Sequence, residues 1–488
     1  MQRFIFIVLL LTISCLFGCQ DDTPETAAPA KETTAVQQTA STQKDATSKA
    51  AATPNIGKVA LFDAPIEPVV LELPSEALPY WRDTAAGSKP ALVLFSIHPL
   101  LQPIDAVLEG EVATLIDKGT SSDFLLHGSM YRAEPLVLPT QTLSAAIDAK
   151  LFSEIIWAFP STANPDQMQH DLFRKQVTEA GFLTEAEGNA LNLNGGVYKG
   201  TVRGLPFRAV HPAVLPELDK PMVLHVDLGY FKGLYQGEVK TRIYDLLLNT
   251  ALALNETGWQ PLLTTLSYST FEGTFSLDVR FLITNFADML RDPTLLDGTM
   301  PKNWALRSEA LYAVNFFLEG KVQEYYEQAA REYPQDAAAQ YDLYKHLFFE
   351  QRMVDEALKV LDKAVTLDRG YAAAYLELAQ IADNDGNLAA ALELLTKADP
   401  VVPENPMVNL YRAQFLIQSD RKEEALPLID QLESLPWSKH YHPDVPQLLE
   451  QMRDAELTPP AAATDRDKTI NKLEDKPVDD PARQRVLK

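Results

Sequence analysis

The sequence predicts an α/β domain with a mainly parallel, three-layer sheet, followed by an all-α solenoid of paired helices. Two observations predict this. Between residues 56 and 301, short segments that are apolar on both faces alternate with amphipathic segments of helical period. Between residues 303 and 438, a small-residue motif recurs every 34 residues. The first pattern is typical of strands covered by helices on both sides, and the second of a repeat array.

The first 18 residues have the pattern of a secretory signal. Arg3 precedes an apolar core from residue 4 to residue 13, and small residues precede Cys19. The apolar stretch is too short to span a bilayer. The segment Leu16-Phe17-Gly18-Cys19 resembles a bacterial lipoprotein box, and this resemblance implies that Cys19 carries a lipid anchor. Ordinary secretory cleavage remains the alternative.

The positions of the cysteines and the composition of the following segment indicate an exported chain with a disordered N-terminal segment. Cys15 and Cys19 are the two cysteines of the sequence, so the mature chain would have no disulfide and no thiolate metal site. Residues 19–55 are rich in Thr, Ala, Gln, Ser and Lys and nearly lack large apolar residues. We therefore expect a disordered tether with a reach of roughly 30–35 Å. Gln20 after the acceptor cysteine favours the outer membrane in the lipoprotein interpretation.

The predicted α/β domain spans residues 56–301. We expect five strands in it, at 91–95, 123–126, 155–159, 222–226 and 262–266. We expect helices at 107–118, 167–180, 238–255 and 277–291, and a β-hairpin whose turn lies at Asn194-Gly195-Gly196.

Two residues of this domain are candidate metal ligands. His98 follows one predicted strand, and Asp227 ends another, at the edge where α/β sheets hold ligands. The runs Phe95-Ser96-Ile97-His98 and His225-Val226-Asp227 resemble the metal strands of the arginase/deacetylase-like superfamily. The resemblance implies that His98 and Asp227 are retained ligands. Because Ser96, Leu100 and Gly229 stand where that superfamily has carboxylates, the resemblance implies a non-catalytic relative, and we expect no cofactor.

The repeat motif is carried by Ala357, Ala391 and Ala425, each followed four residues later by an aliphatic side chain. A small residue lets one helix approach its partner closely, and the aliphatic residue one turn later fills the space between them. With its 34-residue period, this segment resembles the tetratricopeptide repeat family. We expect a weaker unit before these three. A polar-faced capping helix is expected at 443–457, and a disordered tail at 458–488.

In the tetratricopeptide family the first helix of each pair lines the inner face of the array. The resemblance therefore implies a partner-binding face formed by Asp342, His346, Phe349, Leu376, Gln380, Asp383, Leu410 and Gln414, together with Ile417. Such a mixture of amide, acidic and apolar groups suits an extended peptide or a partner helix. The alternative is that the repeats only pack against the α/β domain.

The charge of the chain limits its partners. With 67 acidic and 43 basic residues, the formal net charge is −24. The acids are spread along the chain, so nucleic acid and anionic lipid headgroups would be repelled. The sequence therefore favours a lipid-anchored adaptor that binds a protein or peptide in the bacterial envelope. The expected location is the outer membrane, with the protein facing the periplasm. A metal-dependent hydrolase is the alternative function, and an enzyme is the less favoured class.

Overall fold

The structure of the chain is a computed structural model that describes residues 60–162, 164–165, 168–235, 241–270 and 276–454. These residues belong to one compact unit that begins at Pro54. The predicted signal at 1–18, the tether at 19–55 and the tail at 458–488 lie outside the described residues. In the described part, no helix is both long and apolar enough to cross a bilayer.

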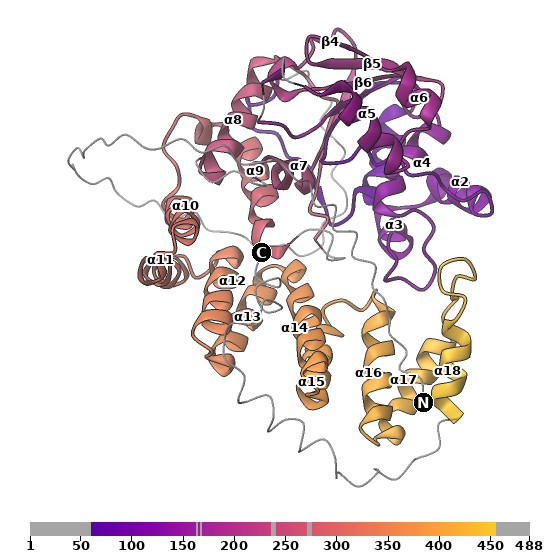
Figure 1. The fold of residues 1–488 in the computed structure, drawn as a ribbon, viewed down its shortest axis with the longest axis vertical. Helices are drawn as coiled ribbons and strands as arrows, with labels where there is room; N and C mark the ends of the chain where they lie inside the picture. The colour runs from indigo at the N-terminus through magenta and orange to yellow at the C-terminus, as the bar shows by residue number, and fades with distance from the viewer. Residues whose placement is uncertain (1–59, 163, 166–167, 236–240, 271–275, 455–488) are drawn as a thin grey trace. The chain divides into compact units, whose positions relative to one another are not determined.

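One eight-stranded sheet forms the centre of the N-terminal domain, in the order β1-β8-β7-β2-β3-β6-β5-β4 (Figure 1). The six strands from β1 to β6 in this order pair in parallel. Strand β5 pairs antiparallel with β6, and β4 pairs antiparallel with β5. In chain order the strands are β1 (Val69–Leu71), β2 (Ala91–Phe95), β3 (Glu154–Ala158), β4 (Asn192–Asn194), β5 (Val197–Val202), β6 (Leu205–Val210), β7 (Met222–Asp227) and β8 (Leu263–Ser267).

Helices cover both faces of the sheet, so the domain has the predicted three layers. Successive residues of a strand point to opposite faces, and accordingly Leu92 and Leu94 contribute to one buried cluster while Val93 and Phe95 contribute to the other. The first cluster includes α1 (Leu78–Ala85), α2 (Glu109–Lys118), α3 (Ser121–His127), α4 (Thr142–Asp148) and α5 (His170–Glu179), with α6 (Glu185–Ala190) beside α5. The second includes α7 (Leu228–Tyr235), α8 (Ile243–Glu256) and α9 (Phe281–Arg291).

The predicted hairpin is confirmed between β4 and β5. Gly195 and Gly196 form its two-residue turn, with φ angles of 55° and 76°. Positive φ at both positions is the geometry that matches the right-handed twist of paired strands, and glycine adopts it without a steric cost.

The strand predicted at 123–126 is wrong, because this segment belongs to helix α3. Thr120 begins the helix with a capping box: its Oγ1 accepts from the Asp123 backbone N at 3.3 Å, and Asp123 Oδ2 accepts from the Thr120 backbone N at 2.7 Å. Phe124 is fully buried, whereas Leu126 is 49% exposed. The short apolar run Phe124 to Leu126 suggests a strand, whereas the capping box that starts at Thr120 indicates a helix.

Short 3₁₀ segments connect several elements of the domain. They are η1 (Pro74–Ala77), η2 (Pro139–Gln141), η4 (Pro212–Val214), η5 (Leu277–Val279) and η6 (Pro293–Leu296). Segment η5 leads directly into α9, so the helix predicted at 277–291 begins with a tighter turn.

The C-terminal region is all helical, and its helices pack as consecutive pairs (Figure 1). The pairs are α10 (Lys302–Asn315) with α11 (Glu319–Glu332), α12 (Ala337–Lys345) with α13 (Val354–Leu367), α14 (Ala373–Asn384) with α15 (Leu388–Ala398), and α16 (Pro406–Gln418) with α17 (Lys422–Glu433). The π-helical turn η7 (His346–Glu350) extends α12, and η8 (Arg369–Ala372) precedes α14. Helix α18 (Val445–Asp454) packs on α17 and buries Leu449 and Met452.

The repeated alanines lie between the paired helices. Ala357, Ala391 and Ala425 are each 0% exposed. One turn later Leu361, Leu395 and Ile429 are at most 2% exposed. The predicted role of these small residues is therefore confirmed by their burial.

We expect Ala391→Leu to lower the free energy of unfolding by about 1–3 kcal/mol, because three additional carbon atoms have no space between α14 and α15. The exposed Ala389 on the same helix is the matched control, and Ala389→Leu should change stability by less than about 0.5 kcal/mol. Urea unfolding followed by circular dichroism measures both. Equal effects of the two substitutions would contradict close packing at Ala391.

Candidate functional site

The turn inside each helical pair has the same backbone geometry. Phe317, Arg352, Gly386 and Asp420 occupy these turns, with φ angles of 55°, 59°, 77° and 60°. The last three are 34 residues apart, so the turn follows the period of the alanines. A left-handed conformation costs a residue other than glycine on the order of 1 kcal/mol. In three of the four turns the left-handed residue is not glycine, so this conformational cost applies to Phe317, Arg352 and Asp420.

A buried arginine joins the first pair of helices to the α/β domain and to α12. Arg307 of α10 is 2% exposed, and its Nε donates to Asp342 at 2.8 Å. Its Nη2 donates to Asp336 at 3.0 Å, and its Nη1 donates to the Tyr244 hydroxyl of α8 at 3.3 Å. Burial opposes the charge, but the two carboxylates keep the pKa of Arg307 well above its ordinary value. The side chain therefore stays ionised inside the protein.

A second buried arginine makes two bidentate pairs. Arg280, which immediately precedes α9, donates to both oxygens of Glu72 at 2.6 and 2.9 Å and to both oxygens of Asp368 at 2.7 and 2.9 Å. Glu72 follows β1, and Asp368 follows α13 of the array. The guanidinium also lies 3.6 Å from the Tyr268 ring centre. A Cβ atom at Gly370 would overlap the guanidinium, so this position of η8 requires glycine.

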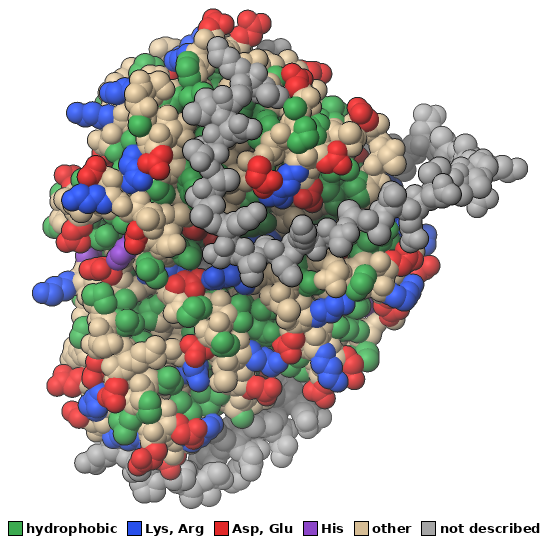
Figure 2. All heavy atoms as spheres, turned by 180° about the vertical axis from the view of Figure 1, so that it is seen from behind, with side chains coloured by type: hydrophobic (Ala, Val, Ile, Leu, Met, Phe, Trp, Pro, Cys, Tyr) green, Lys and Arg blue, Asp and Glu red, His purple; other side chains and the backbone are tan. Residues whose placement is uncertain are grey.

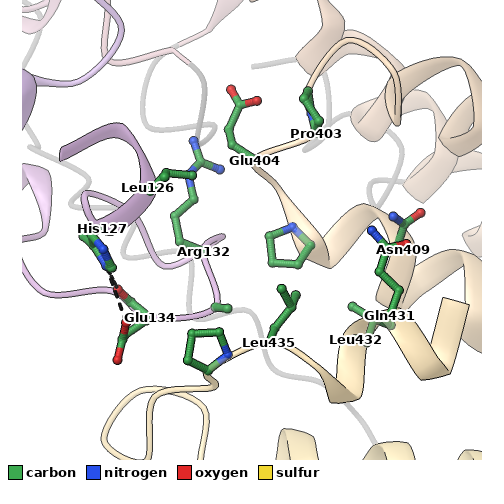
Figure 3. Close-up of a pocket in the computed structure, with 13 residues that line it drawn as sticks. Leu126, His127, Arg132, Glu134, Pro403, Glu404, Asn409, Gln431, Leu432 and Leu435 are labelled. Carbon is green, nitrogen blue, oxygen red and sulfur yellow. Dashed lines mark hydrogen bonds and ion pairs between the residues drawn. The ribbon is translucent and has the colours of Figure 1, made fainter. Parts of the chain in front are cut away.

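The other end of the array also contacts the α/β domain. After α17, the Ser438 backbone N donates to the Ala133 carbonyl at 2.8 Å, and His442 Nε2 lies 2.9 Å from the Arg132 carbonyl. A cavity of about 300 Å³ lies beside these contacts. Figure 3 shows its two walls: Leu126, His127, Arg132 and Glu134 from the α/β domain, and Pro403, Glu404, Asn409, Gln431, Leu432 and Leu435 from the array.

Three of the predicted partner-binding residues are buried. Asp342 is held by Arg307, and His346 lies beside Gln351 Nε2 at 3.1 Å and packs edge-on against Tyr326. Leu410 is 5% exposed within the core. Asp342 and His346 are therefore engaged inside the protein, because the first helical pair covers this part of the predicted face, while Leu410 belongs to the hydrophobic core.

The other predicted residues reach the surface to different degrees. Gln380 is exposed, and Leu376, Asp383 and Gln414 are half-buried on α14 and α16, as is Ile417. Phe349 is half-buried in η7, where its ring packs edge-on against Phe348 at 5.0 Å. The exposed Ile381 and Tyr411 lie on the same two helices. The accessible part of the predicted face therefore belongs to α14 and α16.

The two residues predicted as metal ligands each have partners inside the protein. Asp227 is 3% exposed and accepts hydrogen bonds from the Gly229 backbone N at 2.8 Å, Ser267 Oγ at 2.7 Å and Ser269 Oγ at 2.5 Å. Burial raises the pKa of Asp227, and these three donors oppose the increase. His98 instead stacks on Phe182 at 5.2 Å, and burial lowers its pKa.

The hydrogen bonds of Asp227 continue between the neighbouring strands β7 and β8. Ser267 Oγ lies 3.2 Å from His225 Nε2, and Thr265 Oγ1 lies 2.9 Å from His225 Nδ1. Trp81 Nε1 donates to Thr265 at 3.2 Å. Burial lowers the pKa of His225 to about 3, so the ring is neutral. Within the described ranges, no three His, Cys, Asp or Glu residues are grouped as metal ligands. The described residues thus add no third ligand to His98 and Asp227, and a metal site at these two residues stays a prediction.

Comparison with known proteins identifies the class of the repeats. Residues 348–408 match the family model of the tetratricopeptide repeat. The matched segment contains α13, α14 and α15, which include two of the repeated alanines. A comparison with curated proteins found no match. The C-terminal region thus contains tetratricopeptide repeats, a class that supports binding of a protein partner.

Sequence reasoning did not identify the two buried arginines. Nothing in the local sequence of Arg280 or Arg307 distinguishes them from exposed arginines, because their carboxylate partners are distant in the chain. The apolar run Phe316-Phe317-Leu318 was also missed as a surface feature. Its signal was available, since the 34-residue period places a turn there and turns are usually polar.

We expect Arg280→Met to lower the free energy of unfolding by about 3–5 kcal/mol, because it leaves Glu72 and Asp368 without their shared cation. Arg291 is the matched control: it pairs with Glu67 at the surface, where the two side chains are 40% and 74% exposed. Arg291→Met should cost less than about 1 kcal/mol. Thermal unfolding of the two variants makes the comparison. A small effect of Arg280→Met would show that the buried pairs do not hold the two regions together.

Proposed function

We propose that the protein is a lipid-anchored adaptor of the bacterial cell envelope, which binds a protein or peptide partner through its tetratricopeptide repeats. The observation that supports partner binding best is the accessible face of α14 and α16. It presents the Gln380 and Gln414 amides beside Leu376, with the exposed Ile381 and Tyr411 on the same helices. Amides can bond to a peptide backbone while apolar groups contact its side chains.

The position of this face suits recognition. Its helices belong to the third and fourth pairs of an array that contacts the α/β domain at both ends, through Arg280 and Arg307 near α12 and through Ser438 after α17. A face on rigid helices loses little conformational entropy when a partner binds. The α/β domain, whose buried carboxylate Asp227 is already satisfied by internal donors, acts in this proposal as the support of the array.

The envelope location rests on the sequence. An apolar segment of signal type precedes Cys19, and residues 20–55 have the composition of a tether. The outer membrane, with the protein facing the periplasm, is the location we propose. The charge of −24 is compatible with an anchor that enters the bilayer through acyl chains rather than through contact with anionic headgroups.

We expect Gln380→Lys combined with Gln414→Lys to remove a specific partner that co-purifies with the protein after crosslinking in the native envelope. Both substitutions replace hydrogen-bonding amides with solvated cations. Thr396→Lys is the matched control, because Thr396 is exposed on α15, the second helix of its pair. Mass spectrometry with isotope labelling compares the three samples. Retention of the same partner by the double variant would contradict binding at α14 and α16.

We expect Cys19→Ser to abolish incorporation of a radiolabelled fatty acid and to move the protein from the membrane fraction to the periplasmic fraction. Cys15→Ser is the control, since both cysteines lie near the end of the signal. Labelling of the Cys19→Ser protein, or loss of label only in the Cys15→Ser protein, would contradict an anchor at Cys19.

A further inference from the structure

Exposed apolar side chains gather at two turns of the array. Among the described residues, thirteen large hydrophobic side chains are exposed, and seven of them lie in or beside the turns of the first two helical pairs. These seven are Tyr312, Val314, Phe316, Phe317, Leu318, Met353 and Val354, and we call them the turn patch. Single exposed hydrophobic residues are ordinary, whereas a contiguous group indicates a contact surface.

The first turn projects its apolar residues into solvent. Phe317 has a left-handed backbone, with φ of 55°, and its side chain is 89% exposed. Phe316 is 51% exposed, and its ring lies 4.6 Å from that of Tyr312. The chain is exposed without a break from residue 314 to residue 321. Phe317 therefore has a left-handed backbone, which is unfavourable for a residue with a side chain, and its ring contacts little of the protein itself.

The second turn continues this surface. Arg352 has the same left-handed backbone, and Met353 and Val354 after it are 42% and 46% exposed. Stacked repeats place equivalent turns along one edge of an array, and α11, which follows the first turn, packs on α12, which precedes the second. The next two turns on that edge are polar, with Gly386 and Asp420 at the equivalent positions. The turn patch is thus confined to one end of the edge.

Acidic side chains accompany the turn patch. Glu319 follows the first turn, while Glu350, Asp355 and Glu356 flank the second, and all four are exposed. None of these four forms a salt bridge with another described residue. Lys321 and Arg352 are the bases in the two segments 312–321 and 350–356, so acids are in excess. Such a surface attracts apolar groups that are bordered by positive charge.

The charges argue against two other occupants. In a symmetric contact between two copies, the same patch meets itself, so the four acids of one copy would face the four acids of the other. An anionic bilayer would be repelled by the same acids and by the net charge of −24. On the face of the molecule that Figure 2 presents, acidic and basic side chains are interspersed.

We propose that the turn patch binds a second, basic segment of polypeptide, an amphipathic helix whose apolar face is bordered by Lys or Arg. Phe316 and Phe317 provide the apolar contact, and Glu319, Asp355 and Glu356 pair with the flanking cations. This inference rests on the proposed adaptor function and adds a separate surface to it. The patch lies on the turn edge of the first two pairs, whereas the adaptor face lies on α14 and α16.

A defined peptide tests the proposal. The probe is a fluorescent helical peptide of Leu and Lys with about 18 residues, roughly five turns of helix. A second peptide carries Glu at each Lys position. Fluorescence anisotropy with the full chain carrying Cys19→Ser should show saturable binding of the Lys peptide. Binding of the Glu peptide should be weaker by at least about tenfold, and salt should weaken the binding of the Lys peptide.

Two variants identify the surface. Phe316→Ser with Phe317→Ser should weaken binding of the Lys peptide by at least about tenfold, because both rings are exposed anchors. Val107→Ser with Leu252→Ser is the matched control on exposed apolar residues of the α/β domain, and should leave this binding unchanged. Circular dichroism confirms that all variants are folded. Equal binding by the original chain and the Phe316→Ser/Phe317→Ser variant would overturn the proposal.

Further outcomes separate the alternatives. The Gln380→Lys/Gln414→Lys variant should bind the Lys peptide normally, so loss of its envelope partner would concern the adaptor face alone. Equal binding of the Lys and Glu peptides would overturn the proposed charge recognition. Dissociation of a dimer by Phe316→Ser/Phe317→Ser in sedimentation would instead assign the patch to a second copy. If the Phe316→Ser/Phe317→Ser variant no longer floats with phosphatidylethanolamine vesicles but still binds the Lys peptide, the turn patch would be assigned to a bilayer.

Discussion

The arrangement of the chain depends on the Arg280 guanidinium. It forms bidentate pairs with Glu72 after the first strand and with Asp368 inside the array. A buried cation without its carboxylates would be strongly unfavourable, so the three segments that supply these groups must come together. Arg307 imposes the same requirement between α8, α10 and α12. The repeats and the sheet are therefore parts of one cooperative structure.

Because of these contacts with the α/β domain, the first helices of the repeats differ in how far they are exposed to solvent. Near α12, the first helix of a repeat is covered, and its polar residues Asp342 and His346 are used internally. The corresponding faces of α14 and α16 keep amide and apolar groups within reach of solvent. The first two pairs thus join the array to the α/β domain through buried ion pairs, and the segment after α17 contacts the domain again. Between these contacts, α14 and α16 keep an accessible surface, and the turn patch lies at the turns of the first two pairs.

The α/β domain shows how a ligand position can be filled by the protein itself. Parallel sheets commonly bind ligands at the carboxyl ends of their strands, where Asp227 lies. Here Ser267, Ser269 and the Gly229 backbone satisfy the carboxylate, and the neighbouring His225 is buried and neutral. Asp227 thus belongs to an internal hydrogen-bond network, whereas His98 stacks on Phe182. The network connects β7 to β8.

The sequence by itself determined the fold class, the paired helices and the hairpin, because these depend on local period and on residues such as Gly195 and Ala391 whose size is decisive. Its apolar pattern alone did not show that 123–126 is a helix, since the three apolar residues Phe124 to Leu126 fit either period and only the capping box at Thr120 indicates a helix. Only tertiary structure decided which candidate residues are accessible. The burial of Asp342 and the internal partners of Asp227 depend on segments distant in the chain, and no local pattern encodes such contacts.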